Sequence, residues 1–381
     1  MTMWIIIFWV SIAFAITTLF YVSARIPNLI EFINLTEWRS FKRFSLGLLI
    51  TLGFTGLLTL CIDFINAIVC VMYIAMIWAL SDFAFLLIER LIHITFAHYY
   101  AGWAALFISI IALSIGWYSD HNVWQTNYEL KTNKQMPDLK VAMFADSHIG
   151  TTFDDKDFAK HLETIQTQNP DILLIAGDYV DDGTTREQMI HSTRTLGQIK
   201  TKYGIYYVSG NHDKGYYGAA YRGFSEDDLF DELKKNGINI LQDESVLVDN
   251  LFYIVGRKDY SVQHEQGGHR KSIEELTKDL DKSKYIIVLD HQPVEYDKEA
   301  VARVDLVLNG HTHGGQLFPF NQVGKWIGAN DLVYGYKKLG NTDFIVTSGI
   351  SDWAIKFKTG TKSEFVIINI MKGERNESAA N

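Results

Sequence analysis

The chain has 381 residues and a formal net charge of −9 at pH 7, and its mean hydropathy is +0.02. This acidic balance excludes a general nucleic-acid-binding surface, because neutralising a run of phosphates requires a basic face. Both cysteines, Cys61 and Cys70, lie inside apolar runs, which excludes a disulfide framework or a zinc–cysteine site in the polar part of the chain.

The first 118 residues are overwhelmingly apolar and predict an all-α membrane domain, residues 1–118, with about four transmembrane helices. Residues 4–22 form the first predicted span. The stretch 44–88 is about twice the roughly 20 residues of one span, and Asp63 and Asn66 near its middle predict a turn between two helices. Residues 99–118 form the fourth span. The alternative, a soluble helix bundle, is disfavoured because soluble helices alternate polar and apolar faces.

Basic residues in the short loops predict the orientation of these spans. They are Arg25, Arg39, Lys42 and Arg43 after the first span, and Arg90 after the third. We expect both loops to be cytoplasmic, which places the C-terminal domain on the extracytoplasmic side. Loop 23–43 is also a candidate interfacial helix. Asp82 lies inside the third span, either as a functional group or as a hydrogen-bonded position within the bundle, and we favour the second interpretation.

After a predicted polar linker, residues 119–137, short β-rich runs alternate with charged, helix-like stretches. This pattern is typical of an α/β domain, predicted over 138–373 and followed by a polar tail, 374–381. Five apolar runs end in residue types that bind metal ions, and these residues are Asp146 and His148; Asp178 and Asp181; Asn211, His212 and Asp213; His291; and His311 and His313. Because strands of one sheet end along a common edge, we expect these side chains to converge.

The residue types indicate which metals could bind. Asp-x-His and His-x-His on extended backbone would place both side chains on one face. Carboxylates, imidazoles and one carboxamide, without a thiolate, favour a site for divalent metal ions such as Mn, Fe or Zn without choosing among them. The glycines Gly177, Gly210 and Gly310 precede ligand positions and would let the chain turn close to an ion. Each motif alone is also typical of a surface turn, but their joint occurrence favours a shared site.

The motifs Asp-x-His, Gly-Asp-x-x-Asp, Gly-Asn-His-Asp, a single His and Gly-His-x-His run in this order over residues 146–313. This series resembles the calcineurin-like metallophosphoesterase superfamily, and Gly-His-Thr-His-Gly-Gly-Gln is similar to its bacterial membrane-associated branch. The resemblance implies an α/β (α+β) four-layer sandwich, in which two central sheets are flanked by helices. It also implies a binuclear metal centre and a location in the bacterial cell membrane.

The resemblance implies a role for each matching residue. The first metal would be held by Asp146, His148 and His313, the second by Asn211, His291 and His311, and Asp178 would bridge them. His212 would stand beside the scissile phosphate as a general acid or charge stabiliser. Asp213 would fix the tautomer of His212, and Asp181 would orient a ligand without binding metal.

These roles predict a metal-dependent phosphohydrolase that cleaves phosphomonoesters or phosphodiesters at the membrane surface. Two divalent ions roughly 3.5–4 Å apart would activate a bridging water. The expected partners are membrane lipids and a phosphoester substrate, for which a lipid-linked ester is one candidate, and no nucleic acid is expected. An alternative is a non-catalytic membrane sensor or scaffold with a structural metal site. A transporter is a third hypothesis and depends on the spans alone.

The chain departs from the branch near its C-terminus. Trp-Ala-Ile-Lys at 353–356 and Lys-Ser-Glu at 362–364 replace a Pro-x-Arg and a Pro-Glu pair, which leaves the substrate contacts open. Segment 216–224 is a candidate wall of the substrate site. Arg257, Lys258 and Arg270 are candidate anion contacts.

Overall fold

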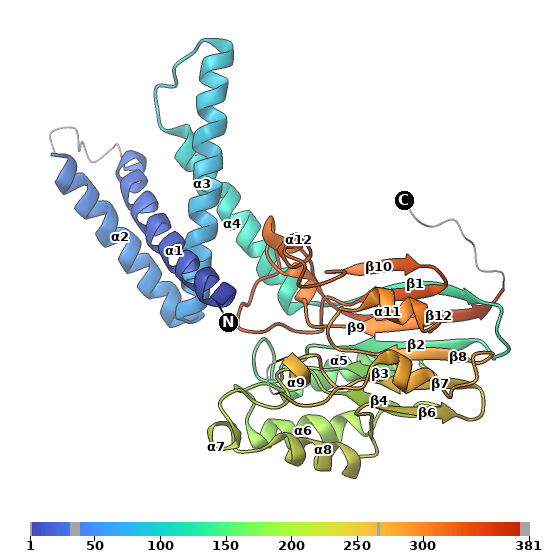
Figure 1. Cartoon of the computed structure of the whole chain (residues 1–381). Helices are drawn as coiled ribbons and strands as arrows, with labels where there is room; N and C mark the ends of the chain where they lie inside the picture. The colour runs from blue at the N-terminus through green and yellow to red at the C-terminus, as the bar shows by residue number, and fades with distance from the viewer. Residues whose placement is uncertain (1, 31–38, 265–266, 374–381) are drawn as a thin grey trace. The chain divides into compact units, whose positions relative to one another are not determined.

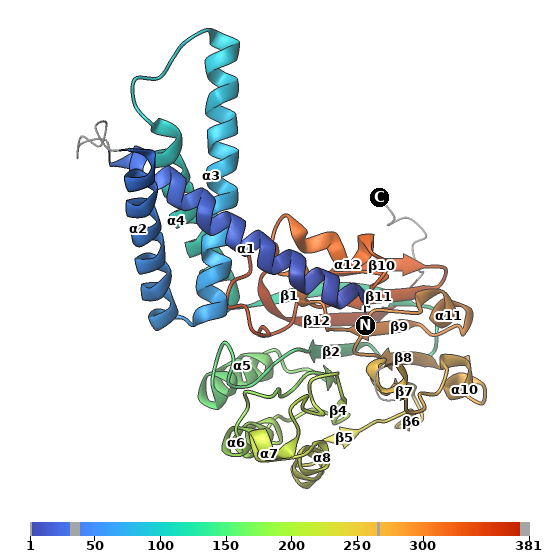
Figure 2. The same ribbon diagram turned by 60° about the vertical axis from the view of Figure 1, so that its left-hand side comes forward.

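The computed structural model describes residues 2–30, 39–264 and 267–373. The chain forms two compact units, Met1–Ile115 and Gly116–Asn381. The first unit is helical and the second contains both β-sheets (Figures 1 and 2).

Four long helices make up the N-terminal part, and each is long and apolar enough to cross a membrane. They are α1 (Thr2–Leu29), α2 (Ser40–Cys61), α3 (Phe64–Ile92) and α4 (Tyr100–His121). Large apolar side chains such as Leu49 and Leu60 are exposed on them, as lipid-facing positions require. The four predicted helices are therefore confirmed.

The predicted turn within the apolar stretch 44–88 is present between α2 and α3. The Asp63 carboxylate accepts the backbone N–H of Asn66 at 2.9 Å and thereby caps the N-terminus of α3. The predicted interfacial helix at 23–43 overlaps the end of α1 and the start of α2. Its central part, 31–38, lies outside the described residues.

The second unit contains two six-stranded sheets. The first has the spatial order β1 (Val123–Thr132), β12 (Ser363–Lys372), β2 (Leu139–Phe144), β3 (Ile172–Ala176), β4 (Ile205–Val208) and β5 (Asn239–Ile240). The second has the order β10 (Gly335–Leu339), β11 (Thr342–Val346), β9 (Leu306–Asn309), β8 (Tyr285–Leu289), β7 (Phe252–Gly256) and β6 (Glu244–Val248). Strands β2, β3 and β4 are parallel, and so are β7, β8 and β9. The five predicted ligand-bearing strands are therefore all present.

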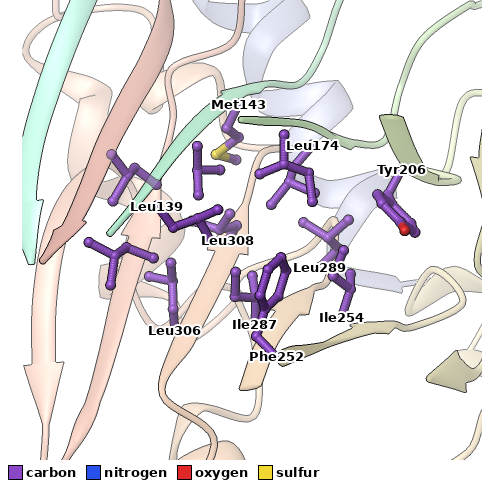
Figure 3. Packing of buried hydrophobic residues seen from close by; sticks show 14 of the residues in the cluster. Leu139, Met143, Leu174, Tyr206, Phe252, Ile254, Ile287, Leu289, Leu306 and Leu308 are labelled. Atoms are coloured by element: carbon purple, nitrogen blue, oxygen red, sulfur yellow. The ribbon is translucent and has the colours of Figure 1, made fainter. Parts of the chain in front are cut away.

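The two sheets pack face to face over a shared apolar core (Figure 3). Along β2, Val141 and Met143 belong to this core, whereas Ala142 and Phe144 belong to a second cluster on the opposite face. This alternation follows the two-residue period of a strand. Both faces of β2 are apolar because the strand is buried on both sides.

Helices cover the outer face of each sheet. Apolar residues of α5 (Asp155–Thr167), α6 (Arg186–Leu196) and α8 (Glu226–Lys235) pack on the first sheet. Residues of α10 (Ile273–Thr277) and α11 (Tyr296–Val301) pack on the second. The short helices are α7 (Ala219–Arg222), α9 (Ser261–His264), η3 (His313–Gly315), η4 (Phe320–Gln322) and α12 (Val323–Trp326). The result is the predicted four-layer sandwich.

The predicted linker, residues 119–137, differs from the structure because it contains strand β1. This strand pairs in parallel with β12, from Val123 opposite Ser363 to Thr132 opposite Lys372. An edge strand has solvent-facing positions that accept polar side chains, and the polar composition of 119–137 therefore did not distinguish it from a linker. The predicted tail, 374–381, lies outside the described residues.

Candidate metal centre

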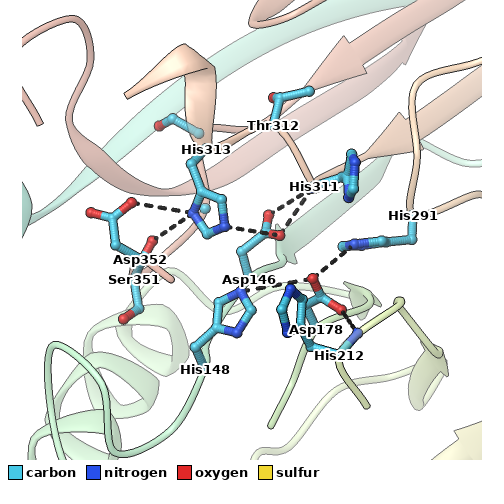
Figure 4. A network of polar contacts seen from close by, with 12 residues as sticks. Asp146, His148, Asp178, His212, His291, His311, Thr312, His313, Ser351 and Asp352 are labelled. Atoms are coloured by element: carbon cyan, nitrogen blue, oxygen red, sulfur yellow. Dashed lines mark hydrogen bonds and ion pairs between the residues drawn. The ribbon is translucent and has the colours of Figure 1, made fainter. Parts of the chain in front are cut away.

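The predicted ligand residues come together at the ends of five strands. Strands β2, β3 and β4 deliver them from the first sheet, and β8 and β9 deliver them from the second. In Figure 4 the labelled imidazoles and carboxylates from both sheets face a common centre. The predicted convergence is therefore present. The predicted ligands fall into two sets, and a further group of His148, Asp181 and His212 shares His148 with the first set.

The first set consists of Asp146, His148 and His313, whose potential ligand atoms lie within 4.8 Å of one another. His313 Nε2 is 3.8 Å from Asp146 Oδ1, and the rings of His148 and His313 stack with centroids 5.2 Å apart. All three residues are buried. Their donor atoms therefore face one another in a site with little access to bulk water.

The second set consists of Asp178, His291 and His311, again within 4.8 Å of one another. His291 Nε2 lies 3.0 Å from Asp178 Oδ2, and His311 Nδ1 lies 2.9 Å from the side-chain oxygen of Asn211. The same Asp178 oxygen is 3.7 Å from His148 Nε2. Asp178 therefore stands between the two sets.

The backbone of the Asp-x-His pair and of the His-x-His pair was predicted to be extended, and this prediction was wrong. Five ligand positions have φ in the left-handed region: Asp146 at 55°, His148 at 37°, Asp178 at 52°, His311 at 72° and His313 at 49°. The chain turns sharply past each strand end, which directs these side chains back over the edge of the sheets. Left-handed backbone is unfavourable for residues with a Cβ and tends to occur at functional sites.

All three predicted glycines lie close beside the ligands, and a Cβ on Gly210 would clash with the Asp178 carboxylate. Gly177 has φ 89°, and a Cβ on Gly310 would lie 2.5 Å from Asp146 Oδ2. Gly177 therefore supplies a backbone conformation that other residues adopt with difficulty, and Gly310 supplies the space for the Asp146 carboxylate.

The orientation of the imidazoles fits a divalent cation. His291 Nδ1 contacts the Ala176 carbonyl oxygen at 2.7 Å, which leaves Nε2 directed at Asp178. The Nε2 atom of His148 is buried and has no hydrogen-bond partner among the described residues. Its Nδ1 atom lies 3.5 Å from Asp181 Oδ2, a contact that is common behind metal-binding histidines, and the orienting role of Asp181 stays a prediction.

The carboxylates of the cluster differ in pKa. Burial alone would raise the pKa of Asp178, but the neighbouring His291 and His212 outweigh burial and hold that pKa well below its usual value. Burial, reinforced by repulsion from Asp178, raises the pKa of Asp146 to about 6, although His291 opposes the increase. Asp178 is therefore the carboxylate most strongly stabilised in its charged form by neighbouring positive charge.

His212 lies beside both sets, but its predicted partner does not contact its ring. The His212 ring is 5.0 Å from the His148 ring, and its backbone N–H donates to Asp178. Asp213 was predicted to fix the His212 tautomer. Instead, the Asp213 carboxylate accepts backbone N–H groups of the two strand-end turns, which are those of Asp178, Tyr179, Val180 and Gly210. Because four donors occupy this carboxylate, Asp213 organises the turns that carry the ligands.

Comparison with known proteins identifies the family. The sequence profile of calcineurin-like phosphoesterases matches residues 139–315. A metallophosphoesterase of Campylobacter jejuni is 30% identical over 276 residues, which are 70% of this chain and 70% of the relative. The chain belongs to the calcineurin-like phosphoesterase family. The resemblance inferred from the motifs is thereby confirmed, and the chain is a metal-dependent phosphoesterase.

Another relative of this phosphoesterase is a zebrafish protein named transmembrane protein with metallophosphoesterase domain. It is 28% identical over 248 residues, which are 62% of this chain and 54% of that protein. Together with the four apolar helices, this similarity indicates a membrane protein. A solved dimetal phosphatase of zebrafish covers 55% of this chain and 86% of its own at 12% identity, with a TM-score of 0.37.

Three residues of the phosphoesterase site were not assigned a role from the sequence. Asp352 Oδ1 lies 3.2 Å from His313 Nδ1, and the fully buried Lys358 ammonium is 3.5 Å from the same oxygen. The ring of Trp353 is 5.1 Å from the ring of His212. The sequence offered no signal for the first two contacts, because neither Asp352 nor Lys358 belongs to a ligand motif.

The loop after His212 forms part of the site. The Tyr216 ring lies 5.1 Å from the His212 ring, and its hydroxyl oxygen accepts from the Asn211 amide at 3.0 Å. Arg222 is buried and donates to the backbone carbonyl oxygens of His212 and Asp213. In this candidate wall, Tyr216 therefore contacts site residues, whereas Arg222 supports the backbone beneath them.

Two of the three basic residues predicted to contact an anionic substrate are already paired with carboxylates of the protein. Arg257 and Arg270 are buried and form ion pairs with Asp290 and Glu295. A guanidinium that is already paired in the interior is not available to a substrate. Lys258 is less buried and lines a separate cavity of about 330 Å³.

Proposed function

We propose that this protein hydrolyses phosphomonoester or phosphodiester bonds at the membrane surface through a binuclear metal centre. The observation that carries the proposal is the position of the Asp178 carboxylate. Its Oδ2 atom lies 3.0 Å from His291 Nε2 and 3.7 Å from His148 Nε2. A carboxylate between two imidazole sets is suited to bridge two cations, which supports two metal ions in place of one.

In this proposal, the ligands are those predicted from the sequence. Asp146, His148 and His313 hold one ion, Asn211, His291 and His311 hold the other, and Asp178 belongs to both. Divalent cations bound there would polarise a shared water and neutralise the charge on phosphate oxygens. Protein side chains then contribute positioning and charge stabilisation, and a serine or cysteine nucleophile is not required.

His212 is the proposed catalytic residue of the protein itself. Its ring lies beside the first set, 5.0 Å from the His148 ring, and between the rings of Tyr216 and Trp353. From this position its imidazole would stabilise charge on the phosphoryl group or donate a proton to the departing oxygen. Asp213 serves His212 indirectly, because it holds the backbone of the neighbouring strand-end turn.

The predicted location at a membrane also suggests a class of substrate. Four membrane-spanning helices attached to a hydrolase concentrate its site at a lipid surface, so a lipid-linked phosphoester is the substrate class that we propose. From the basic residues of the short loops we also propose that the catalytic unit lies on the extracytoplasmic side of a bacterial membrane. Equal rates with short-chain and acylated forms of one ester would contradict the lipid preference.

The decisive experiment measures Mn²⁺-dependent hydrolysis of paired chromogenic monoester and diester substrates by the full-length protein in detergent. Asp178→Asn should lose both bound metal and activity. His212→Ala should retain its metal content while kcat falls by about 100- to 10,000-fold, the usual contribution of a general acid. The preferred ester then distinguishes a monoesterase from a diesterase.

A matched control is available in His191→Ala. The His191 side chain is 61% exposed and lies on α6, outside both ligand sets, so its removal should leave the rate unchanged. A metal-loaded parent protein that hydrolyses no ester would contradict the proposal and favour a scaffold with a structural metal site.

A further inference from the structure

The helical unit contains an open cavity of about 750 Å³ that the phosphoesterase function does not use. It lies at the end of the unit where α1 and α3 end and α2 and α4 begin, because its lining residues come from these four helices and from the connection 93–99. Its volume falls within the range of small-molecule sites. Charged residues are costly within a membrane span and are therefore candidates for a function.

Asp82 and Arg25 are both partly exposed and line one part of this cavity. The Asp82 carboxylate accepts hydrogen bonds from the hydroxyls of Tyr21 and Tyr99, both at 2.6 Å, and its Oδ2 lies 2.9 Å from Arg25 Nε. The predicted hydrogen-bonded position of Asp82 is therefore present. Because a guanidinium has five N–H donors, the contact with Asp82 engages only part of Arg25 and holds the remainder at the cavity.

A second basic residue lines the same cavity. Arg43 at the start of α2 donates through Nη2 to the side-chain oxygen of Asn28 at 2.8 Å, and both residues line the cavity together with Arg25. Two guanidinium groups beside an amide form a suitable site for the oxygen atoms of a phosphate.

The cavity lining supplied by α3, the connection 93–99 and the start of α4 is acidic and aromatic, whereas the lining described above is basic. Glu89 accepts the backbone N–H of Phe96 at Oε1, and a carboxylate can accept further donors. The rings of Phe85, Phe96 and Tyr100 are in contact, with centroid separations of 5.3 and 5.8 Å, and all of them line the cavity. A carboxylate beside aromatic rings is a suitable site for an ammonium group.

The basic part of the cavity lining and its acidic, aromatic part are separated along α3. Asp82, which holds Arg25, and Glu89 are seven residues apart, or about 10 Å along a helix. The cavity lining carries two arginines and two carboxylates, and their formal charges cancel. A net anionic ligand matches this balance less well than a ligand with one negative and one positive group.

We propose that this cavity binds the headgroup of a zwitterionic phospholipid that carries an ammonium group, such as phosphatidylethanolamine. The lipid phosphate contacts Arg25 and Arg43, and the ammonium lies between Glu89 and the aromatic rings. The site belongs entirely to the helical unit, so it is independent of the metal centre and of the substrate proposed above.

The test uses the full-length protein purified in detergent and depleted of lipid. Phosphatidylethanolamine, phosphatidylglycerol and soluble phosphoethanolamine are added separately, and the melting temperature is measured. A saturating specific ligand should raise it by about 5 °C, and we expect this shift with phosphatidylethanolamine alone. Native mass spectrometry should show one retained phosphatidylethanolamine per chain.

The variants distinguish the cavity from general lipid contact. Arg43→Gln and Glu89→Gln should abolish the shift and the retained lipid, whereas Arg43→Lys, which keeps the charge but not the fork of donors, should retain part of both. Glu89→Gln retains an acceptor for the Phe96 N–H, so its lipid-free melting temperature should match that of the parent protein. The controls are Lys42→Gln and Arg90→Gln, since both residues are exposed neighbours outside the cavity.

Several results would overturn the proposal. Equal stabilisation by phosphatidylglycerol would refute the zwitterionic headgroup, and an equal shift with soluble phosphoethanolamine would refute a membrane lipid as the ligand. Full lipid retention in Arg43→Gln and Glu89→Gln would show that lipid binds elsewhere on the helices.

Discussion

Replacing Asp352 should weaken metal binding although Asp352 is not itself a proposed ligand. Its Oδ1 atom lies 3.2 Å from His313 Nδ1 and 3.5 Å from the Lys358 ammonium, and both partners are buried. A carboxylate behind a ligand histidine fixes the ring orientation and raises the basicity of the metal-facing nitrogen. For His313 that nitrogen is Nε2, which faces Asp146.

The size of the effect follows from this contact. Loss of such a partner typically reduces metal affinity by about 10- to 100-fold, or about 1.4–2.7 kcal/mol of binding free energy. Asp352→Asn keeps the size of the side chain but loses the charge, while the Ser351 carbonyl oxygen, 3.3 Å from His313 Nδ1, remains as an acceptor, so we expect a loss of about tenfold. Asp352→Ala loses the charge and also the side-chain atoms that pack behind the His313 ring, and it should approach the upper value.

The assay is calorimetric titration of Mn²⁺ into the metal-free full-length protein in detergent. Asp305→Asn is the control, because the Asp305 carboxylate is also buried and paired with a lysine, at 2.5 Å from Lys134, but it is not part of either ligand set. It should lower the melting temperature and leave Mn²⁺ affinity unchanged. An unchanged Mn²⁺ affinity in Asp352→Ala would refute the reasoning, as would an equal loss of affinity in the control.

Two further predictions concern stability. Burial would raise the pKa of Glu295, but hydrogen bonds from Lys298 and Arg257 outweigh it and lower the pKa to about 2, below the ordinary value of 4.5. The resulting stabilisation is fully present above about pH 4.5 and is lost as the pH falls toward 2; a pH series of melting temperatures should therefore decline less in Glu295→Gln. Leu308→Ala removes a fully buried side chain of the core between the sheets and should lower the free energy of unfolding by about 2–5 kcal/mol in urea denaturation. Leu247→Ala, at a partly exposed position, should cost much less, and equal effects would contradict the packing argument.

The sequence by itself determined the division into membrane helices and an α/β domain, and it predicted which ligand-type residues come together. Both inferences depend on local patterns. Apolar runs of span length need no partner to be recognised, and ligand-type residues directly follow buried strands such as β3 and β9. Because parallel strands of one sheet end at a common edge, local sequence was sufficient to predict that His148 after β2 and Asp178 after β3 meet.

Only the tertiary structure decided the roles that depend on distant partners. Polar strand β1 is held by pairing with β12, which begins 240 residues later at Ser363, opposite Val123. Asp213 faces backbone N–H groups instead of the adjacent His212 ring, and Asp352 reaches His313 from a loop 39 residues further along the chain. Hydrogen bonds and ion pairs satisfy buried polar groups through whichever donor the folded chain brings near, and that proximity is a property of the packed sheets, which no local pattern encodes.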